Sequence, residues 1–154
     1  MSINLYLMRH GEAEADTVDD AQRRLTAKGR ATVGRVAGRL LEAQIRPDTI
    51  EHSGLVRIRE TAEIMSHKLG AMPEYVVGLQ PSGDVLTAAR RLIARAERSV
   101  LVVGHLPFLA RLVSHLLTGE ADEDLFHFRA GAVAVLRNGN GRWTLEWFLA
   151  PSLA

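Results

Sequence analysis

An arginine, a histidine and a glycine stand in a row near the start of the chain, directly after an apolar run. The run Leu5–Met8 leads into Arg9, His10 and Gly11. A guanidinium offers a rigid fork of donors that suits an oxyanion such as phosphate, and a neutral imidazole is a nucleophile toward phosphorus. A glycine lets the backbone approach the second imidazole nitrogen, which would set the tautomer. The triplet is therefore a candidate site for phosphoryl chemistry.

Further polar residues also follow predicted strands. His52 lies at the end of the second strand, Arg57 begins the helix after it, and His105 follows the apolar run 99–104. In an open α/β sheet, ligands bind beyond the carboxyl ends of the parallel strands. If these strands are parallel, two arginines and at least two histidines meet at one edge of the sheet. The helix after His105 would add unpaired N–H groups that attract an anion.

Strands and helices are predicted to alternate along most of the chain. Buried strands are expected at 3–9, 48–53, 74–78 and 99–105, and helices from the N-cap Thr26 to Pro47, at 57–69, at 84–97, and from Pro107 in the first turn to Gly119. The segments "AVAVLR" and "RWTLEWFL" flank "NGNG", a turn sequence typical of hairpins. This order predicts an α/β fold, a three-layer α/β/α sandwich whose central sheet is mostly parallel with an antiparallel C-terminal hairpin.

Length and composition exclude several classes of protein. At 154 residues, the chain is predicted to form a single domain over 1–154. A net charge of +1 without a basic block argues against a nucleic-acid partner. No apolar run is long enough to span a membrane, and the N-terminus lacks the plan of a signal peptide, so a cytoplasmic location is expected. There is no cysteine, no P-loop sequence and no carboxylate cluster for paired metals, which leaves histidine as the nucleophile.

The segments "RHG" (9–11), "LTAKG" (25–29), "SGLVRIRETA" (53–62) and "GHLP" (104–107) come in an order and spacing that resemble one known family. It is the histidine phosphatase superfamily, in its phosphoglycerate-mutase-like branch 1, and the resemblance runs over about residues 3–108. The short chain, "RHGEAE", "LQPSGD" (79–84) and "GHLP" are most similar to the SixA-type bacterial phosphohistidine phosphatases, which act in signal transduction.

The resemblance implies a role for each residue of the predicted site. His10 would be the nucleophile and would form a phosphohistidine intermediate that water hydrolyses. Arg9 and Arg57 would clamp the phosphate, and the spacing S-x-L-x-R favours Arg57 over Arg59 for this role. His105 would donate to the phosphoryl oxygens, with Gly11 beside them. Neither a metal nor an organic cofactor is implied.

One departure from the family pattern bears on the acid and on the substrate. Larger members of the branch carry a glutamate general acid where this chain reads "GLQPSGD" (78–84), which contains none. Asp84 or Glu12 could act instead. Glu12 could also bind the leaving group or simply be solvated, and His52 could line the rim of the site or only be hydrogen-bonded.

The missing acid and the short chain favour a protein substrate. Phosphohistidine leaves through a nitrogen that is easier to protonate than an alkoxide, and the chain has no room for the long lids that enclose small sugars. The sequence therefore predicts a metal-independent phosphatase acting on phosphohistidine of a signalling or phosphotransfer protein. One alternative is a phosphomonoesterase acting on a small phosphorylated metabolite. The other is a non-catalytic adaptor that binds phosphohistidine.

Overall fold

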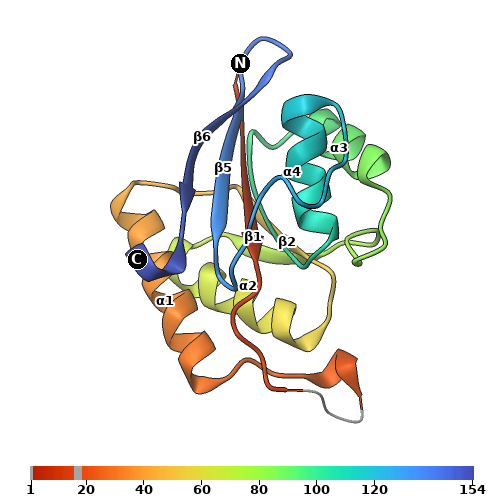
Figure 1. The fold of residues 1–154 in the computed structure, drawn as a ribbon. Helices are drawn as coiled ribbons and strands as arrows, with labels where there is room; N and C mark the ends of the chain where they lie inside the picture. The colour runs from red at the N-terminus through yellow and green to blue at the C-terminus, as the bar shows by residue number, and fades with distance from the viewer. Residues whose placement is uncertain (1, 16–18) are drawn as a thin grey trace.

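The computed structural model describes residues 2–15 and 19–154, and its centre is a six-stranded sheet (Figure 1). The strands are β1 (Ile3–Arg9), β2 (Thr49–His52), β3 (Met72–Tyr75), β4 (Ser99–Gly104), β5 (Val133–Asn138) and β6 (Trp143–Leu149), in the spatial order β3-β2-β4-β1-β5-β6. The first four strands of that order run parallel, whereas β5 pairs antiparallel with both β1 and β6. The predicted mostly parallel sheet with an antiparallel C-terminal hairpin is confirmed.

Helices cover both faces of this sheet, which gives the predicted three layers. The helices α1 (Ala27–Glu42) and α2 (Val56–Leu69) pack on one face, and α3 (Val85–Ala94) and α4 (Phe108–Thr118) pack on the other (Figure 1). Side chains of β1 alternate between the two cores, because successive residues of a strand point to opposite faces. Leu5 and Leu7 join the core under α3 and α4, while Tyr6 and Met8 join the core under α1 and α2.

The predicted helix ends follow ordinary capping chemistry. The Thr26 side chain accepts a hydrogen bond from the Gly29 N–H and caps α1. Gly70 and Gly119 end α2 and α4 in the left-handed conformation that glycine adopts at little cost. Pro107, predicted in the first turn, is instead the N-cap residue of α4.

Three predicted boundaries are wrong. The first helix ends at Glu42 rather than at Pro47, and Gln44 just after it has a positive φ of 61°, which a helix does not allow. The third strand covers Met72–Tyr75 rather than 74–78, because pairing with the four residues of β2 sets its length, and Val77 is left 77% exposed. Pro73 is tolerated there because β3 lies at the edge of the sheet. The helix predicted at 84–97 covers only Val85–Ala94, since Arg95 adopts an extended backbone and pairs with the buried Glu51 of β2.

The central pair of strands positions the candidate residues. Arg9 of β1 lies opposite Gly104 of β4 in parallel register, and the His10 N–H donates to the Gly104 carbonyl at 3.0 Å. His10 and His105 therefore follow the carboxyl ends of two neighbouring parallel strands and lie at the same end of the sheet. In residues 2–15 and 19–154, no helix is long and apolar enough to cross a membrane.

Candidate active site

His10 lies in a buried position with one ring nitrogen held by the backbone. Its Nδ1 is 2.7 Å from the carbonyl oxygen of Gly11. A carbonyl only accepts hydrogen bonds, so Nδ1 carries the proton and the neutral ring keeps its lone pair on Nε2. This is the tautomer that a nucleophile attacking through Nε2 requires.

Gly11 is needed because its surroundings leave no room for a side chain. A Cβ at this position would lie 2.6 Å from Cγ2 of Val33 and 3.2 Å from the carbonyl oxygen of Gly29. The Gly11 N–H donates to Oγ1 of the fully buried Thr61 at 3.1 Å, and that hydroxyl donates to the Arg57 carbonyl at 2.8 Å. One chain of hydrogen bonds therefore joins His10 to the helix that carries Arg57.

Burial keeps His10 unprotonated at neutral pH. It lowers the pKa of the imidazole from 6.5 to about 4, with smaller contributions from the charges of Arg57 and Arg9, while the hydrogen bond to Gly11 opposes the shift. The charges of the two arginines therefore act in the same direction as burial, but loss of contact with water is the larger cause.

Two arginines approach this ring from different parts of the chain. Arg9 donates from Nη1 to the Phe128 carbonyl at 2.8 Å, and Arg57 donates from Nη1 to the Asp20 carbonyl at 3.0 Å. The Nε atoms of Arg9 and Arg57 are both buried, and neither has a hydrogen-bond partner among the described residues. Buried unpaired donors are costly, so these two atoms are suited to receive the oxygens of a bound oxyanion.

Arg57 rather than Arg59 belongs to this group. The Arg57 side chain is only 8% exposed, whereas the Arg59 side chain is 50% exposed and pairs with Glu63 one helical turn away. The preference that the spacing indicates is therefore consistent with where the two side chains lie.

His105 completes the group from the end of β4. The residue is 2% exposed, and Nε2 donates to the Leu79 carbonyl at 3.2 Å. Burial, followed by the charge of Arg57, lowers the pKa of His105 to about 4. Arg9 lies opposite Gly104, the residue before His105, and Thr61 joins Gly11 to the Arg57 carbonyl, so the structure brings Arg9, His10, Arg57 and His105 to one end of the sheet.

The two carboxylates considered as acids are held by other partners. Asp84 caps α3, where it accepts from the Leu86 N–H at 3.1 Å and from the Thr87 hydroxyl at 2.6 Å. The hydrogen bond from Thr87 leads the causes that lower the pKa of Asp84, so the carboxyl is ionised at neutral pH and has no proton to donate. Glu12 accepts from the Thr26 hydroxyl at 3.0 Å and lies 3.9 Å from Nζ of Lys28.

His52 makes local contacts at the end of β2. Its Nδ1 accepts a hydrogen bond from the Gly54 N–H at 3.2 Å, and its ring packs edge-on against Tyr75 with centroids 6.3 Å apart. Burial lowers the pKa of His52, as expected for a neutral ring that accepts at Nδ1. These contacts favour the hydrogen-bonded alternative over a place on the rim of the site.

Several residues around the site were not predicted from the sequence. Asp20 pairs with Arg57 at 3.4 Å and also pairs with Arg23, and the hydrogen bond from Arg23 is the leading cause of its lowered pKa. Nothing in its loop indicates this contact. Thr61 lies four residues after Arg57, where a helical threonine can reach the carbonyl of the preceding turn, so the spacing alone could have shown it.

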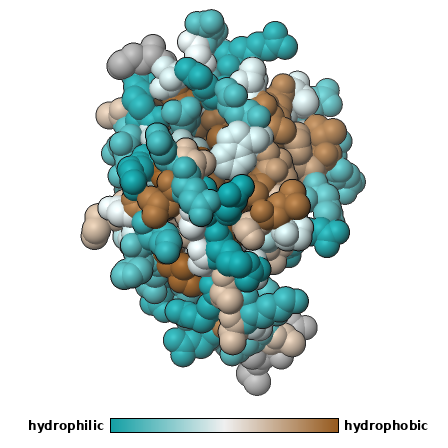
Figure 2. Space-filling model, turned by 90° about the vertical axis from the view of Figure 1, so that its left-hand side faces the viewer, coloured by the Kyte–Doolittle hydropathy of each residue, from teal (hydrophilic) through white to brown (hydrophobic). Residues whose placement is uncertain are grey.

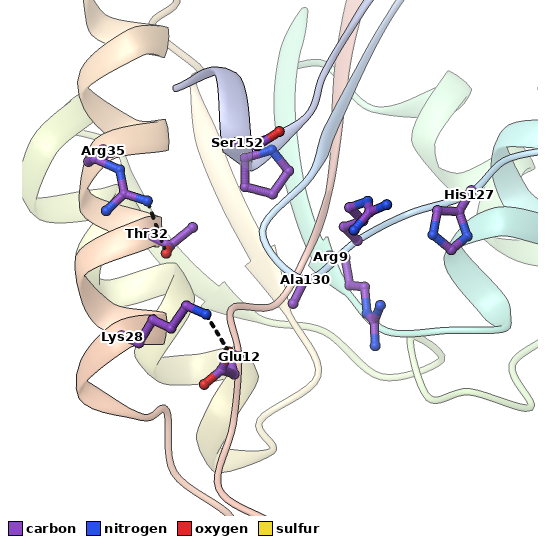
Figure 3. Close-up of a pocket in the computed structure, with 10 residues that line it drawn as sticks. Arg9, Glu12, Lys28, Thr32, Arg35, His127, Ala130 and Ser152 are labelled. Carbon is purple, nitrogen blue, oxygen red and sulfur yellow. Dashed lines mark hydrogen bonds and ion pairs between the residues drawn. The ribbon is translucent and has the colours of Figure 1, made fainter.

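A cavity of about 460 Å³ opens beside Arg9 (Figure 3). It was not predicted, because its walls come from α1, from the irregular segment 127–130 and from the C-terminal helix η2 (Pro151–Leu153). His127 is exposed and lines this cavity. Over the described ranges, no group of three or more histidine and carboxylate side chains is placed to hold a metal ion.

Comparisons with known proteins agree with this geometry. Residues 5–80 match the model of the histidine phosphatase superfamily (branch 1). An uncharacterised protein of Picosynechococcus is 34% identical over 91% of this chain and 88% of its own length. The phosphohistidine phosphatase SixA of Escherichia coli is 29% identical over 97% of this chain and 94% of its own length. A solved structure of the protein histidine phosphatase SixA complexed with tungstate superposes with a TM-score of 0.89, at 29% identity, over 98% of this chain and 99% of that chain.

Proposed function

Since this chain belongs to branch 1 of the histidine phosphatase superfamily and is a phosphatase, we propose that its substrate is phosphohistidine on another protein and that His10 is the nucleophile. One observation carries the proposal. His10 is a buried neutral imidazole whose Nε2 lone pair is not used by its hydrogen bond to Gly11, and it stands beside two arginines whose buried Nε donors have no partner within 2–15 and 19–154.

The reaction takes place in two steps. In the first, Nε2 of His10 attacks phosphorus while Arg9 and Arg57 hold the phosphoryl oxygens, and the bond from phosphorus to the substrate nitrogen breaks. The substrate imidazole leaves with the electron pair of that bond and takes up a proton. In the second, water attacks the phosphohistidine of the enzyme, phosphate is released, and His10 returns to its neutral form. The two guanidiniums stabilise the charge on the phosphoryl oxygens in both transition states.

His105 assists by changing its protonation state on substrate binding. With Nε2–H donated to the Leu79 carbonyl, the neutral ring has only an acceptor left on Nδ1. A phosphoryl dianion placed nearby raises the pKa of the ring, because an opposite charge favours the cationic form. The imidazolium then donates from Nε2 to Leu79 and from Nδ1 to a phosphoryl oxygen.

The surroundings of the site favour a phosphoramidate over a phosphomonoester. Asp84 is committed to capping α3, and Glu12 is held by Thr26 and Lys28. An alkoxide leaving group needs a strong proton donor, whereas an imidazole nitrogen is protonated readily by water. The E. coli relative is named a phosphohistidine phosphatase, which supports the same substrate for this chain.

A comparison of second-order rates tests the proposal. The kcat/KM for a phosphohistidine protein should exceed that for a panel of sugar phosphates, nucleotides and other monoesters by orders of magnitude. His10→Ala should abolish turnover while Arg59→Ala, a matched change on the exposed face of α2, retains it, and EDTA should not affect the rate. Monoesters that react faster would establish the small-molecule alternative. Tight binding of phosphohistidine without turnover would establish the adaptor.

A further inference from the structure

The cavity beside Arg9 forms a groove that is rich in positive charge. Two of its cations, Lys28 and Arg35, come from α1 (Figure 3). A third, Arg129, comes from the irregular segment 127–130. With Arg9, four permanently cationic side chains line the groove against the single carboxylate of Glu12. The face of the molecule that carries α1 is largely hydrophilic, with separate apolar patches among the polar residues (Figure 2).

Most of this positive charge is not neutralised within the chain. Arg35 donates to the Thr32 hydroxyl at 3.3 Å, and no carboxylate among the described residues pairs with Arg35 or Arg129. Lys28 is 3.9 Å from Glu12, and its side chain is 82% exposed. The groove therefore presents accessible cations to anything that enters it.

The spacing of the cations fits an extended partner better than one phosphate. Lys28 and Arg35 are seven residues apart on α1, which places them about 10 Å apart along the helix axis. An extended peptide covers that distance in roughly three residues. A small metabolite would be mostly enclosed by its site, whereas these side chains are open to solvent.

We infer that this groove binds acidic residues next to the phosphohistidine of the partner protein. The inference rests on the proposed function, because Arg9 belongs both to the groove and to the candidate catalytic group. The phosphohistidine enters at Arg9, and carboxylates on the same partner lie along Lys28, Arg35 and Arg129. Charge complementarity of this kind raises the rate of association and selects among partners.

Three peptides of equal length test the inference. Each carries one phosphohistidine, flanked by aspartates, alanines or lysines, and kcat/KM is measured for each at low ionic strength. The wild type should prefer the aspartate peptide over the alanine peptide about tenfold, because each exposed ion pair contributes a factor of up to about five. Salt should reduce the preference, since screening weakens exposed charge pairs.

The double variant Arg35→Glu, Arg129→Glu should remove this preference or reverse it. The control Arg142→Glu makes the same charge change in the turn between β5 and β6, at the end of the sheet away from the site, and should keep the preference (Figure 1). The ratio of two peptide rates in one preparation does not depend on how much of the variant is folded. An unfolded fraction therefore cannot imitate the result.

Each other outcome overturns a different statement. If the aspartate and alanine peptides react equally fast in the wild type, the groove does not read acidic residues, although the proposed function stands. The double variant could instead lower kcat/KM for a small bisphosphorylated metabolite and leave kcat/KM for the aspartate peptide unchanged. That result would assign the groove to a small molecule. If no phosphohistidine peptide reacts but monoesters do, the proposed function fails and the inference fails with it.

Discussion

Replacing His10 by alanine should change how the free energy of unfolding depends on pH. In the unfolded chain the imidazole binds a proton below about pH 6.5, whereas burial lowers the pKa to about 4 in the folded protein. Between these values the unfolded state binds more protons than the folded state, so this histidine makes the protein less stable as the pH falls. The alanine variant lacks that dependence.

The magnitude follows from the two pKa values. Over the whole window from 6.5 to about 4, the lowered pKa of His10 corresponds to about 3 kcal/mol. Between pH 7 and pH 5, the linkage relation gives about 2 kcal/mol of lost stability from this one group. Titrating groups far from His10 are present in both proteins. Their contributions therefore cancel when the variant is compared with the wild type.

Urea unfolding at several pH values measures the difference. The buffer must contain no phosphate, because an anion in the site would stabilise the imidazolium and mask the shift. The wild type should lose about 2 kcal/mol more than His10→Ala between pH 7 and pH 5. His67→Ala, which removes an exposed histidine of α2, should behave as the wild type does. A gap between wild type and His10→Ala that stays constant with pH would refute the reasoning.

Three further changes have defined outcomes. Arg57→Ala should lower kcat/KM by roughly 10²-fold, because a donor to the transition-state charge is lost. Arg59→Ala should lower it much less, and the reverse order in steady-state kinetics would assign the phosphate clamp to Arg59. Thr61→Val should reduce the free energy of unfolding by about 1–3 kcal/mol, since the Gly11 N–H would be buried without an acceptor. A variant as stable as the wild type in urea would show that this hydrogen bond is dispensable. Glu51→Gln should destabilise the fold by about 3 kcal/mol, because Glu51 is fully buried and pairs with two arginines. An unchanged midpoint of thermal unfolding would contradict this.

The fold was predictable where an apolar pattern and a turn sequence agreed. The residues of β1 are buried on both faces, and a continuous apolar run is typical of such a strand. The third strand was misplaced because Val76 and Val77 look like strand residues, whereas pairing with β2 decides where β3 lies. A single sequence contains no direct record of that pairing.

The candidate site was predictable only in part. Arg9, His10 and His105 were predicted to lie together because they stand at or just after the carboxyl ends of two parallel strands, which meet at one end of the sheet. Asp20 and the Phe128 carbonyl were not found, because they lie in loops and approach their arginines through the tertiary fold. The groove was missed for the same reason, since Arg129 comes from a segment that has no periodic pattern.

The most direct test of the account is the site of the covalent label during turnover. The enzyme is mixed with a substrate labelled on phosphorus, quenched within milliseconds in alkaline denaturant that preserves phosphohistidine, digested and mapped by mass spectrometry. The account predicts a label on the ring of His10 that acid removes, and no labelled peptide from His10→Ala. Label on any other residue, or undiminished turnover by His10→Ala, would contradict it.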